Sequence, residues 1–219
     1  MKKVMTVFLF AFAMLFQLSA NENWFAEKFP EKLINKSGKE VDAATALKDK
    51  MVAVYFSASW CGPCRGFTPI LVKFYKQTAK KSGIELIFVS SDKTSADMMG
   101  YMEKYSMPWL GLPFDALQKA ALKKELGVAG IPRLVVFGKD GKLLSRDARW
   151  DVTILGAKAV ESWQKEDYKP LTYQDAKKLK DSSKNNVKTK NKKKTKRTKT
   201  YKSSQYLPGS TVKKGPIGK

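Results

Sequence analysis

Two short apolar runs with a helical pattern between them restrict the fold of this 219-residue chain more than any other feature. Residues 51–56 are continuously apolar and strand-forming, and residues 84–89 form a second run of this kind. Runs of this length are typical of strands buried on both faces of a sheet. Between them, apolar residues recur every three or four positions over 63–81, which predicts a helix that ends at Ser82-Gly83.

The remaining elements complete an α/β pattern. In chain order, we expect a short hairpin around 33–41, helices over 42–47, 95–105 and 115–126, a strand over 134–137, a turn at 140–141 leading into a returning strand from 143, and a helix over 153–163. Asp115 is expected to cap its helix. Strands that alternate with helices, followed by a hairpin and a helix, predict a central mixed β-sheet flanked by helices.

Positive charge is concentrated at the C-terminal end. The net charge is +22, and residues 174–219 hold 16 Lys/Arg against 2 Asp/Glu, with few apolar residues. Such a segment buries too little surface to offset its ordering entropy, so we expect a disordered basic tail. The globular domain is expected over residues 21–173.

Residues 1–20 have the pattern of a secretory signal peptide. Lys2 and Lys3 precede an apolar run over 4–16, and Leu18-Ser19-Ala20 fits a cleavage site. The run is shorter than the roughly 20 residues of a membrane span, although an uncleaved anchor stays open as an alternative. We therefore expect an exported protein, periplasmic or secreted, in a compartment where disulfides persist.

The composition excludes several classes of catalytic site. The chain has no histidine and two cysteines, Cys61 and Cys64. Ser-His-Asp and Cys-His catalysis are therefore excluded, and a closed four-thiolate zinc site cannot form. We expect neither a metal nor an organic cofactor, which leaves carboxylate, lysine or thiol chemistry.

The segment Trp60-Cys61-Gly62-Pro63-Cys64 carries that chemistry, since it follows a predicted strand and opens a predicted helix. Free N–H groups and the helix dipole stabilise an anion there, so Cys61 should form a thiolate more readily than a free cysteine. Pro63 suits the first helical turn. Cys61 is the expected nucleophile, and Cys64, one turn further on, is expected to resolve the mixed disulfide.

Two other interpretations of the cysteine pair are weaker. Half of a metal site would need further Cys or His ligands, which the chain lacks. A static structural disulfide would close so short a loop that it would constrain the unfolded chain little. A redox-active disulfide is therefore the favoured interpretation.

Three segments, 56–69, 107–114 and 130–132, resemble the tryparedoxin and nucleoredoxin branch of the thioredoxin-like proteins. The resemblance covers roughly residues 30–165 and implies a thioredoxin fold. It also implies a cis peptide bond at Ile131-Pro132 facing the active site, with Ile131 offering backbone groups to an extended substrate.

The chain differs from the family pattern at two positions, and the resemblance also points to residues that could support catalysis. Tryparedoxins usually carry proline where this chain has Gly62, and thioredoxins themselves bury an aspartate where Tyr55 stands. Tyrosine, with an ordinary pKa of about 10, is a poor proton acceptor at neutral pH, so the acceptor for Cys64 stays open. Asp92 and Arg149 fall where similar proteins carry charged residues near the site; ordinary surface charge is the alternative.

Two tryptophans receive different predicted roles. Trp60 is expected to shield the edge of the active site. Trp109, which lies in the second resembling segment, is expected to belong to the core.

The favoured function is thiol–disulfide exchange with protein disulfides. The dipeptide Gly62-Pro63 resembles that of reducing thioredoxins and favours reduction of the substrate. An unidentified redox partner would return the cysteine pair to its reduced form. Bacterial exported relatives serve disulfide reduction, isomerisation or cytochrome maturation, and these stay open. Two alternatives are an oxidant that donates its disulfide and a non-catalytic thioredoxin-fold binding protein. The tail is expected to attract an anionic envelope surface, or only to solubilise; nucleic acid is disfavoured, since an exported protein meets little of it.

Overall fold

The computed structural model describes residue 25, residues 28–179 and residues 181–182. The predicted signal peptide, 1–20, and most of the predicted tail, 183–219, lie outside the described residues. The chain divides into two compact units, Met1–Thr172 and Tyr173–Lys219. In the part that the structure describes, no helix is both long and apolar enough to cross a membrane.

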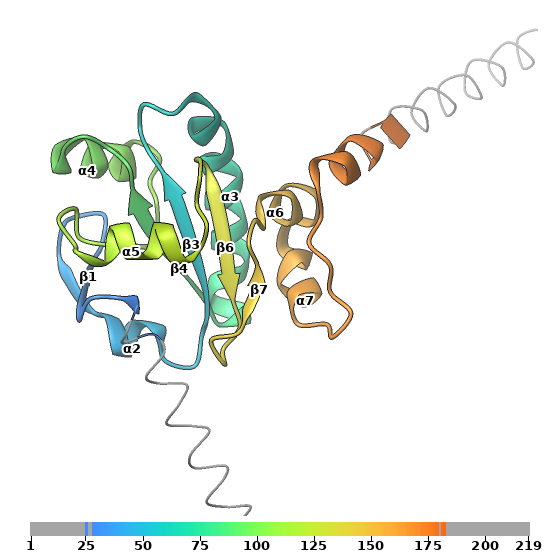
Figure 1. The fold of residues 1–219 in the computed structure, drawn as a ribbon, viewed down its shortest axis with the longest axis horizontal. Coiled ribbons are helices and arrows are strands. Elements are labelled where there is room, and N and C mark those ends of the chain that lie inside the picture. Colours follow the sequence, from blue (N-terminus) through green and yellow to red (C-terminus); the bar gives the residue numbers. More distant parts are fainter. Residues whose placement is uncertain (1–24, 26–27, 180, 183–219) are drawn as a thin grey trace, which may run out of the picture. The chain divides into compact units, whose positions relative to one another are not determined.

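A seven-stranded mixed sheet forms the centre of the first unit, in the order β2-β1-β5-β4-β3-β6-β7 (Figure 1). The strands are β1 (Lys32–Ile34), β2 (Glu40–Asp42), β3 (Met51–Ser57), β4 (Ile84–Ser90), β5 (Leu110–Gly111), β6 (Arg133–Phe137) and β7 (Leu143–Ser145). β4 pairs in parallel with β3 and β5, whereas β6 pairs with β3 and β7 in antiparallel fashion. The prediction of a mixed sheet is confirmed.

Helices cover both faces of this sheet (Figure 1). They are α2 (Ala43–Leu47), α3 (Gly62–Ser82), α4 (Ser95–Lys104), α5 (Gln118–Glu125), α6 (Arg149–Leu155) and α7 (Ala159–Trp163), with a 3-10 turn at Gly156–Lys158. Buried side chains of α3, α4, α6 and α7 share one core cluster, and those of α2 and α5 share another.

The position of β3 between two layers of helices explains why the run 51–56 is apolar at every residue. Tyr55 packs in the first core cluster, and its neighbours Val54 and Phe56 pack in the second. Successive side chains of a strand point to opposite faces, so a central strand between two helical layers needs apolar residues at every position. Full burial of each such side chain stabilises the fold by roughly 1.5–3 kcal/mol.

Two predictions of secondary structure need correction, and one strand was missed. β5 was not predicted, because a two-residue strand has no periodicity and exists only through its pairing with β4. The helix predicted over 115–126 begins at Gln118, and its N-cap is Leu117 rather than Asp115. The helix predicted over 153–163 is interrupted at Gly156, whose φ of 55° is not helical.

The described part of the predicted tail is helical, at residues 173–179 and 181–182. Residues 176–179, Ala-Lys-Lys-Leu, all have high helix propensity, which accounts for this short helix. The disorder predicted for the tail as a whole stays a prediction, since residues 183–219 lie outside the described residues.

Candidate active site

The end of β3 and the start of α3 place the two cysteines. β3 ends at Ser57, and Cys61 is the N-cap of α3, with extended backbone angles. Gly62 and Pro63 form the first helical turn, where the missing N–H of proline costs no hydrogen bond. The predicted strand–turn–helix context of the motif is therefore present.

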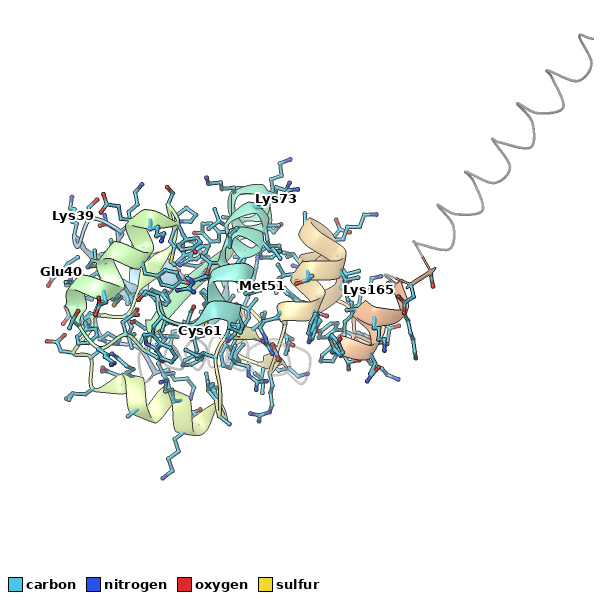
Figure 2. All side chains as sticks on the ribbon, turned by 90° about the horizontal axis from the view of Figure 1, so that it is seen from above. Lys39, Glu40, Met51, Cys61, Lys73 and Lys165 are labelled. Carbon is cyan, nitrogen blue, oxygen red and sulfur yellow. A yellow bond between two sulfur atoms is a disulfide. The ribbon has the colours of Figure 1, made fainter. Side chains whose placement is uncertain are left out.

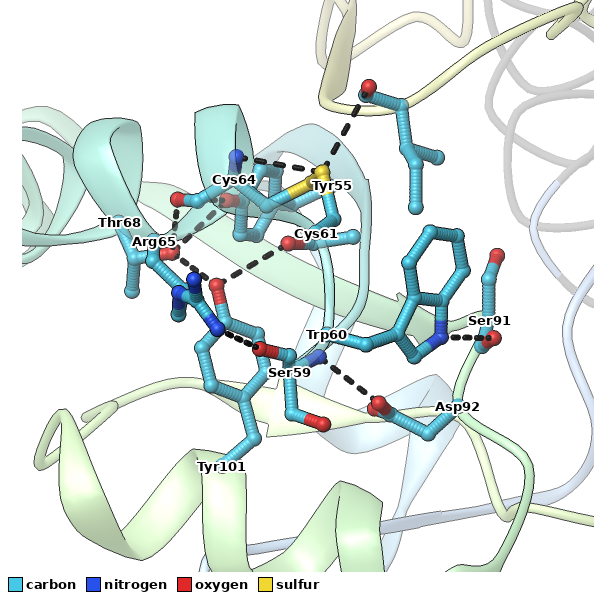
Figure 3. Close-up of a disulfide and its surroundings, with 12 residues drawn as sticks. Tyr55, Ser59, Trp60, Cys61, Cys64, Arg65, Thr68, Ser91, Asp92 and Tyr101 are labelled. Atoms are coloured by element: carbon cyan, nitrogen blue, oxygen red, sulfur yellow. Dashed lines mark hydrogen bonds between the residues drawn. A yellow bond between two sulfur atoms is a disulfide. The ribbon is translucent and has the colours of Figure 1, made fainter.

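Cys61 and Cys64 form a disulfide with a Cα–Cα distance of 5.2 Å (Figure 3). Their exposed fractions are 6% for Cys61 and 0% for Cys64. The backbone N–H of Cys64 lies 3.3 Å from the sulfur of Cys61, to which it donates a hydrogen bond. Cys61 is thus the more accessible sulfur, and it lies where the helix terminus stabilises negative charge.

The loop before β6 faces this disulfide. The Ile131-Pro132 peptide bond is cis, as the family resemblance implied, and Pro132 is buried. The carbonyl oxygen of Ile131 lies 3.7 Å from the sulfur of Cys61. Ile131 packs against the small cluster of Ala58, Cys61 and Cys64, so the loop forms one wall of the site.

A cluster of buried hydroxyl groups lies behind Cys64 (Figure 3). Thr68 donates a hydrogen bond to the carbonyl oxygen of Cys64 at 2.9 Å. Its oxygen also bonds the hydroxyls of Tyr55, at 2.9 Å, and Tyr101, at 2.5 Å. Because Thr68 has one proton, which goes to Cys64, its oxygen accepts from both tyrosines. Ser57 extends the cluster by a hydrogen bond of 3.2 Å to Tyr101.

This cluster sets the role of Tyr55. Burial raises the pKa of the Tyr55 hydroxyl well above its ordinary value, and the neighbouring Tyr101 adds to the rise. Tyr55 therefore stays protonated at neutral pH and acts as a hydrogen-bond donor. Sequence reasoning missed Thr68 and Tyr101. For Thr68, the sequence offered one indication, its position one turn after Cys64 on the predicted helix. For Tyr101, the sequence offered no indication of a place in the site.

Asp92 and Ser91 hold the segment that precedes Cys61. Oδ1 of buried Asp92 accepts a hydrogen bond from the N–H of Ser59 at 2.7 Å, and Oδ2 accepts one from Ser90 at 2.8 Å. The carbonyl of Ser91 accepts a hydrogen bond from the indole N–H of Trp60 at 3.1 Å. Asp92 thus holds the segment just before Cys61, and the Trp60 side chain, fixed through its indole N–H, is 57% exposed.

Arg149 lies in a separate charge cluster. Its guanidinium donates to both carboxylate oxygens of Asp147, at 2.7 and 2.6 Å, and Arg133 pairs with the same carboxylate at 3.1 Å. Among the described residues, no hydrogen bond or ion pair joins Arg149 to either cysteine. Its connection to the site runs through Arg133, the residue after Pro132.

Trp109 is a core residue, as predicted. It is buried, and its ring packs edge-on against Tyr55 and Tyr75. The ring therefore supports the wall of the hydroxyl cluster without reaching the surface of the site.

Known proteins resemble the chain over this domain. The family model described as thioredoxin-like matches residues 49–143. The chain is 43% identical to tryparedoxin of Trypanosoma brucei brucei over 119 residues, which are 53% of this chain and 80% of the relative. It is 44% identical to probable nucleoredoxin 1 of Arabidopsis thaliana over 129 residues, 58% of this chain but 22% of that longer protein.

Solved structures agree with these sequence matches. Tryparedoxin from Trypanosoma brucei superposes with a TM-score of 0.58 at 38% identity, covering 64% of this chain and 97% of that one. Tryparedoxin II complexed with glutathionylspermidine superposes with a TM-score of 0.54 at 34% identity, covering 61% and 91%. With its cysteine pair at the start of α3, the chain belongs to the thioredoxin-like family of thiol–disulfide oxidoreductases.

Proposed function

We propose that the protein reduces disulfide bonds in other proteins, with Cys61 as the nucleophile and Cys64 as the resolving cysteine. The observation that carries this proposal is the asymmetry of the pair. Cys61 is the accessible sulfur at the helix N-terminus and accepts the Cys64 amide hydrogen bond, whereas Cys64 is fully buried. A substrate sulfur can therefore reach Cys61 first.

The reaction proceeds in two exchanges. The thiolate of reduced Cys61 attacks one sulfur of the substrate disulfide, forming a mixed disulfide and releasing the other substrate sulfur as a thiolate. The thiolate of Cys64 then attacks the sulfur of Cys61. This step forms the Cys61–Cys64 disulfide and releases the second substrate sulfur. Two electrons pass from the cysteine pair to the substrate, and the two released thiolates take up protons.

The buried hydroxyl cluster positions Cys64 and does not take its proton. Tyr55, with its raised pKa, stays a donor, and Thr68 is neutral. An extended substrate at Ile131 would lie against the sulfur of Cys61, since that carbonyl is 3.7 Å away.

The test is turnover of a protein disulfide such as that of insulin, with dithiothreitol as the electron source. Cys61→Ser should abolish turnover. Cys64→Ser should accumulate a mixed disulfide, visible by mass spectrometry and on non-reducing gels. Circular dichroism of both variants controls for folding. Turnover by Cys61→Ser equal to that of the unaltered protein would refute the role assignment.

The direction of electron flow is a separate part of the proposal. Gly62-Pro63 between the cysteines is the dipeptide of reducing thioredoxins and favours a reductase. A redox titration against glutathione should give a potential nearer the roughly −270 mV of thioredoxin than the roughly −120 mV of a dedicated oxidant. A value near the second figure would identify a disulfide donor.

A thiol of low molecular mass is one candidate for resetting the pair. A similar protein, tryparedoxin II, has been solved in complex with glutathionylspermidine. Reduction of the Cys61–Cys64 disulfide by glutathione or by a separate protein reductase can be followed by the loss of the disulfide in mass spectra. The faster donor identifies the class of partner.

Export forms part of the same proposal. It is supported by Lys2, Lys3 and the apolar run at 4–16. Mass spectrometry of the protein after expression in a host with a secretory pathway should show cleavage near Ala20. A mature N-terminus at Met1 in the cytosolic fraction would contradict it.

The basic tail is proposed to tether the enzyme to an anionic envelope surface. Its support is the excess of Lys and Arg over residues 174–219. Truncation before Gln174 should abolish salt-sensitive binding to vesicles that contain anionic lipid and leave insulin reduction intact. Binding that survives truncation would exclude the tail as the tether.

A further inference from the structure

One lysine of α5 is linked through a shared serine to the exposed tryptophan of the site, and a second lysine lies on the same face of this helix. The ammonium group of Lys123 donates a hydrogen bond to the side-chain oxygen of Ser91 at 2.7 Å. The carbonyl of the same serine holds the indole of Trp60. Lys123 and Trp60 are therefore linked in space through Ser91, and Trp60 directly precedes Cys61 in the sequence.

Lys119 stands one helical turn before Lys123, on the same face of α5. Its ammonium group lies 4.2 Å from the centre of the Phe114 ring. Both lysines are half-buried, so they are held in place and do not extend freely into solvent. Together, Trp60, Lys119 and Lys123 form a surface that we name the cationic rim.

The positive charge of this rim is not neutralised by an ion pair. Among the described residues, no salt bridge joins Lys119 or Lys123 to a carboxylate. Asp92 and Asp115 attract Lys119 at longer range, whereas, within the described part of the chain, the Asp92 carboxylate accepts its hydrogen bonds from Ser59 and Ser90 and not from a lysine. Burial lowers the pKa of Lys119 below its ordinary value, and the charge of Lys123 lowers it further. An incoming anion would relieve this repulsion.

We propose that the cationic rim binds acidic residues that flank the target disulfide, so that the enzyme prefers protein disulfides with Asp or Glu near the attacked cysteine. The inference rests on the proposed disulfide exchange and names its substrate class. Trp60 supplies exposed apolar surface beside the sulfur, and the lysines supply charge complementarity, which acts mainly on the association rate.

The experiment compares three matched peptides, each with one disulfide, whose flanking residues are acidic, neutral or basic. We expect kcat/KM to be about three- to tenfold higher for the acidic peptide than for the basic one, as two partly exposed charge contacts would give. The preference should shrink between 0.05 and 0.5 M salt, because salt screens exposed charges. The double variant Lys119→Glu/Lys123→Glu should reverse the order of the acidic and basic peptides.

The matched control carries the same charge change elsewhere. Lys73→Glu/Lys76→Glu alters two exposed lysines further along α3. Lys73 lies about 18 Å along the helix axis from Cys61, and Figure 2 labels both residues. This variant should keep the wild-type order of peptides. An equal shift in both double variants would mean that net charge alone sets the preference and would overturn the rim.

Failure of this inference can be told from failure of the proposed function. Equal, Cys61-dependent turnover of all three peptides would overturn the cationic rim and leave disulfide exchange standing. No turnover of any peptide would contradict disulfide exchange itself, and the rim with it.

Discussion

The amide nitrogen of Ser59 lies 2.7 Å from a carboxylate oxygen of Asp92, although the two residues belong to different loops. The residue after Ser59 and the residue before Asp92 form a second link, since the indole of Trp60 donates a hydrogen bond to the carbonyl of Ser91. The loop that carries Cys61 is therefore fastened to the loop after β4 at two points. Asp92 positions this loop without touching either sulfur.

Replacement of Asp92 tests the first of these links. Asp92→Ala leaves the N–H of Ser59 and the hydroxyl of Ser90 without an acceptor, and should lower the free energy of unfolding by about 1–3 kcal/mol. Asp92→Asn keeps one acceptor oxygen and should lose less. Urea unfolding of the oxidised protein measures both. Asp115→Ala, at an exposed aspartate, is the control and should change stability by less than about 0.5 kcal/mol.

Thr68 tests the hydroxyl cluster. Thr68→Val keeps the shape of the side chain but removes the oxygen that joins Cys64, Tyr55 and Tyr101. The free energy of unfolding should fall by about 1–3 kcal/mol, because the buried tyrosine hydroxyls lose a hydrogen-bond acceptor. Thr68→Ser should restore most of the loss. A double-mutant cycle with Tyr101→Phe should give a coupling energy of at least about 0.5 kcal/mol; additive effects would show that the contacts are energetically independent.

Alkylation of the reduced protein tests the helix terminus. Cys61 should react with iodoacetamide faster than Cys64, since it is the accessible sulfur, and its reaction should be half-maximal below the pH of about 8.5 typical of a free cysteine. Peptide mapping separates the two rates. If neither cysteine reacts appreciably below pH 8, a thiolate is not stabilised there, and the catalytic interpretation is wrong.

Two buried tyrosines predict loss of stability in alkali. Burial raises the pKa of Tyr55 and Tyr75 above the ordinary value, and the Glu85 carboxylate raises that of Tyr75 further. Above about pH 10 the unfolded chain releases these protons while the folded chain keeps them. Stability is therefore fully present below pH 10 and falls above it, by up to about 1.4 kcal/mol per pH unit for each tyrosine.

Variants separate these tyrosines from other alkaline titrations. The slope of unfolding free energy against pH between 10 and 11.5 should be shallower for Tyr55→Phe and for Tyr75→Phe than for the unaltered protein. Between pH 7 and 9 each variant should differ from the unaltered protein by a constant amount. A slope unchanged by either substitution would show that the tyrosines titrate alike in both states.

Local patterns in the sequence determined the strand–helix–strand unit and the cysteine pair. The run at 51–56 had to be apolar throughout, because β3 lies between two helical layers, and that requirement is visible in the residues themselves. Cys61 at the N-cap followed from a strand, a short turn and Pro63 in adjacent positions. The family resemblance, rather than periodicity, implied the cis bond before Pro132 and pointed to Asp92.

Only the tertiary structure decided which distant residues meet. β5 exists through its pairing with β4, and Thr68 and Tyr101 join the site because α3 and α4 pack on the same face of the sheet. Arg133 is paired with Asp147, which lies 14 residues further along the chain, and no local pattern indicated this contact. Hydrogen bonds and charge pairs depend on distances across the sheet, and these are set by packing of whole elements, whereas a strand or a helix terminus is set by neighbours along the chain.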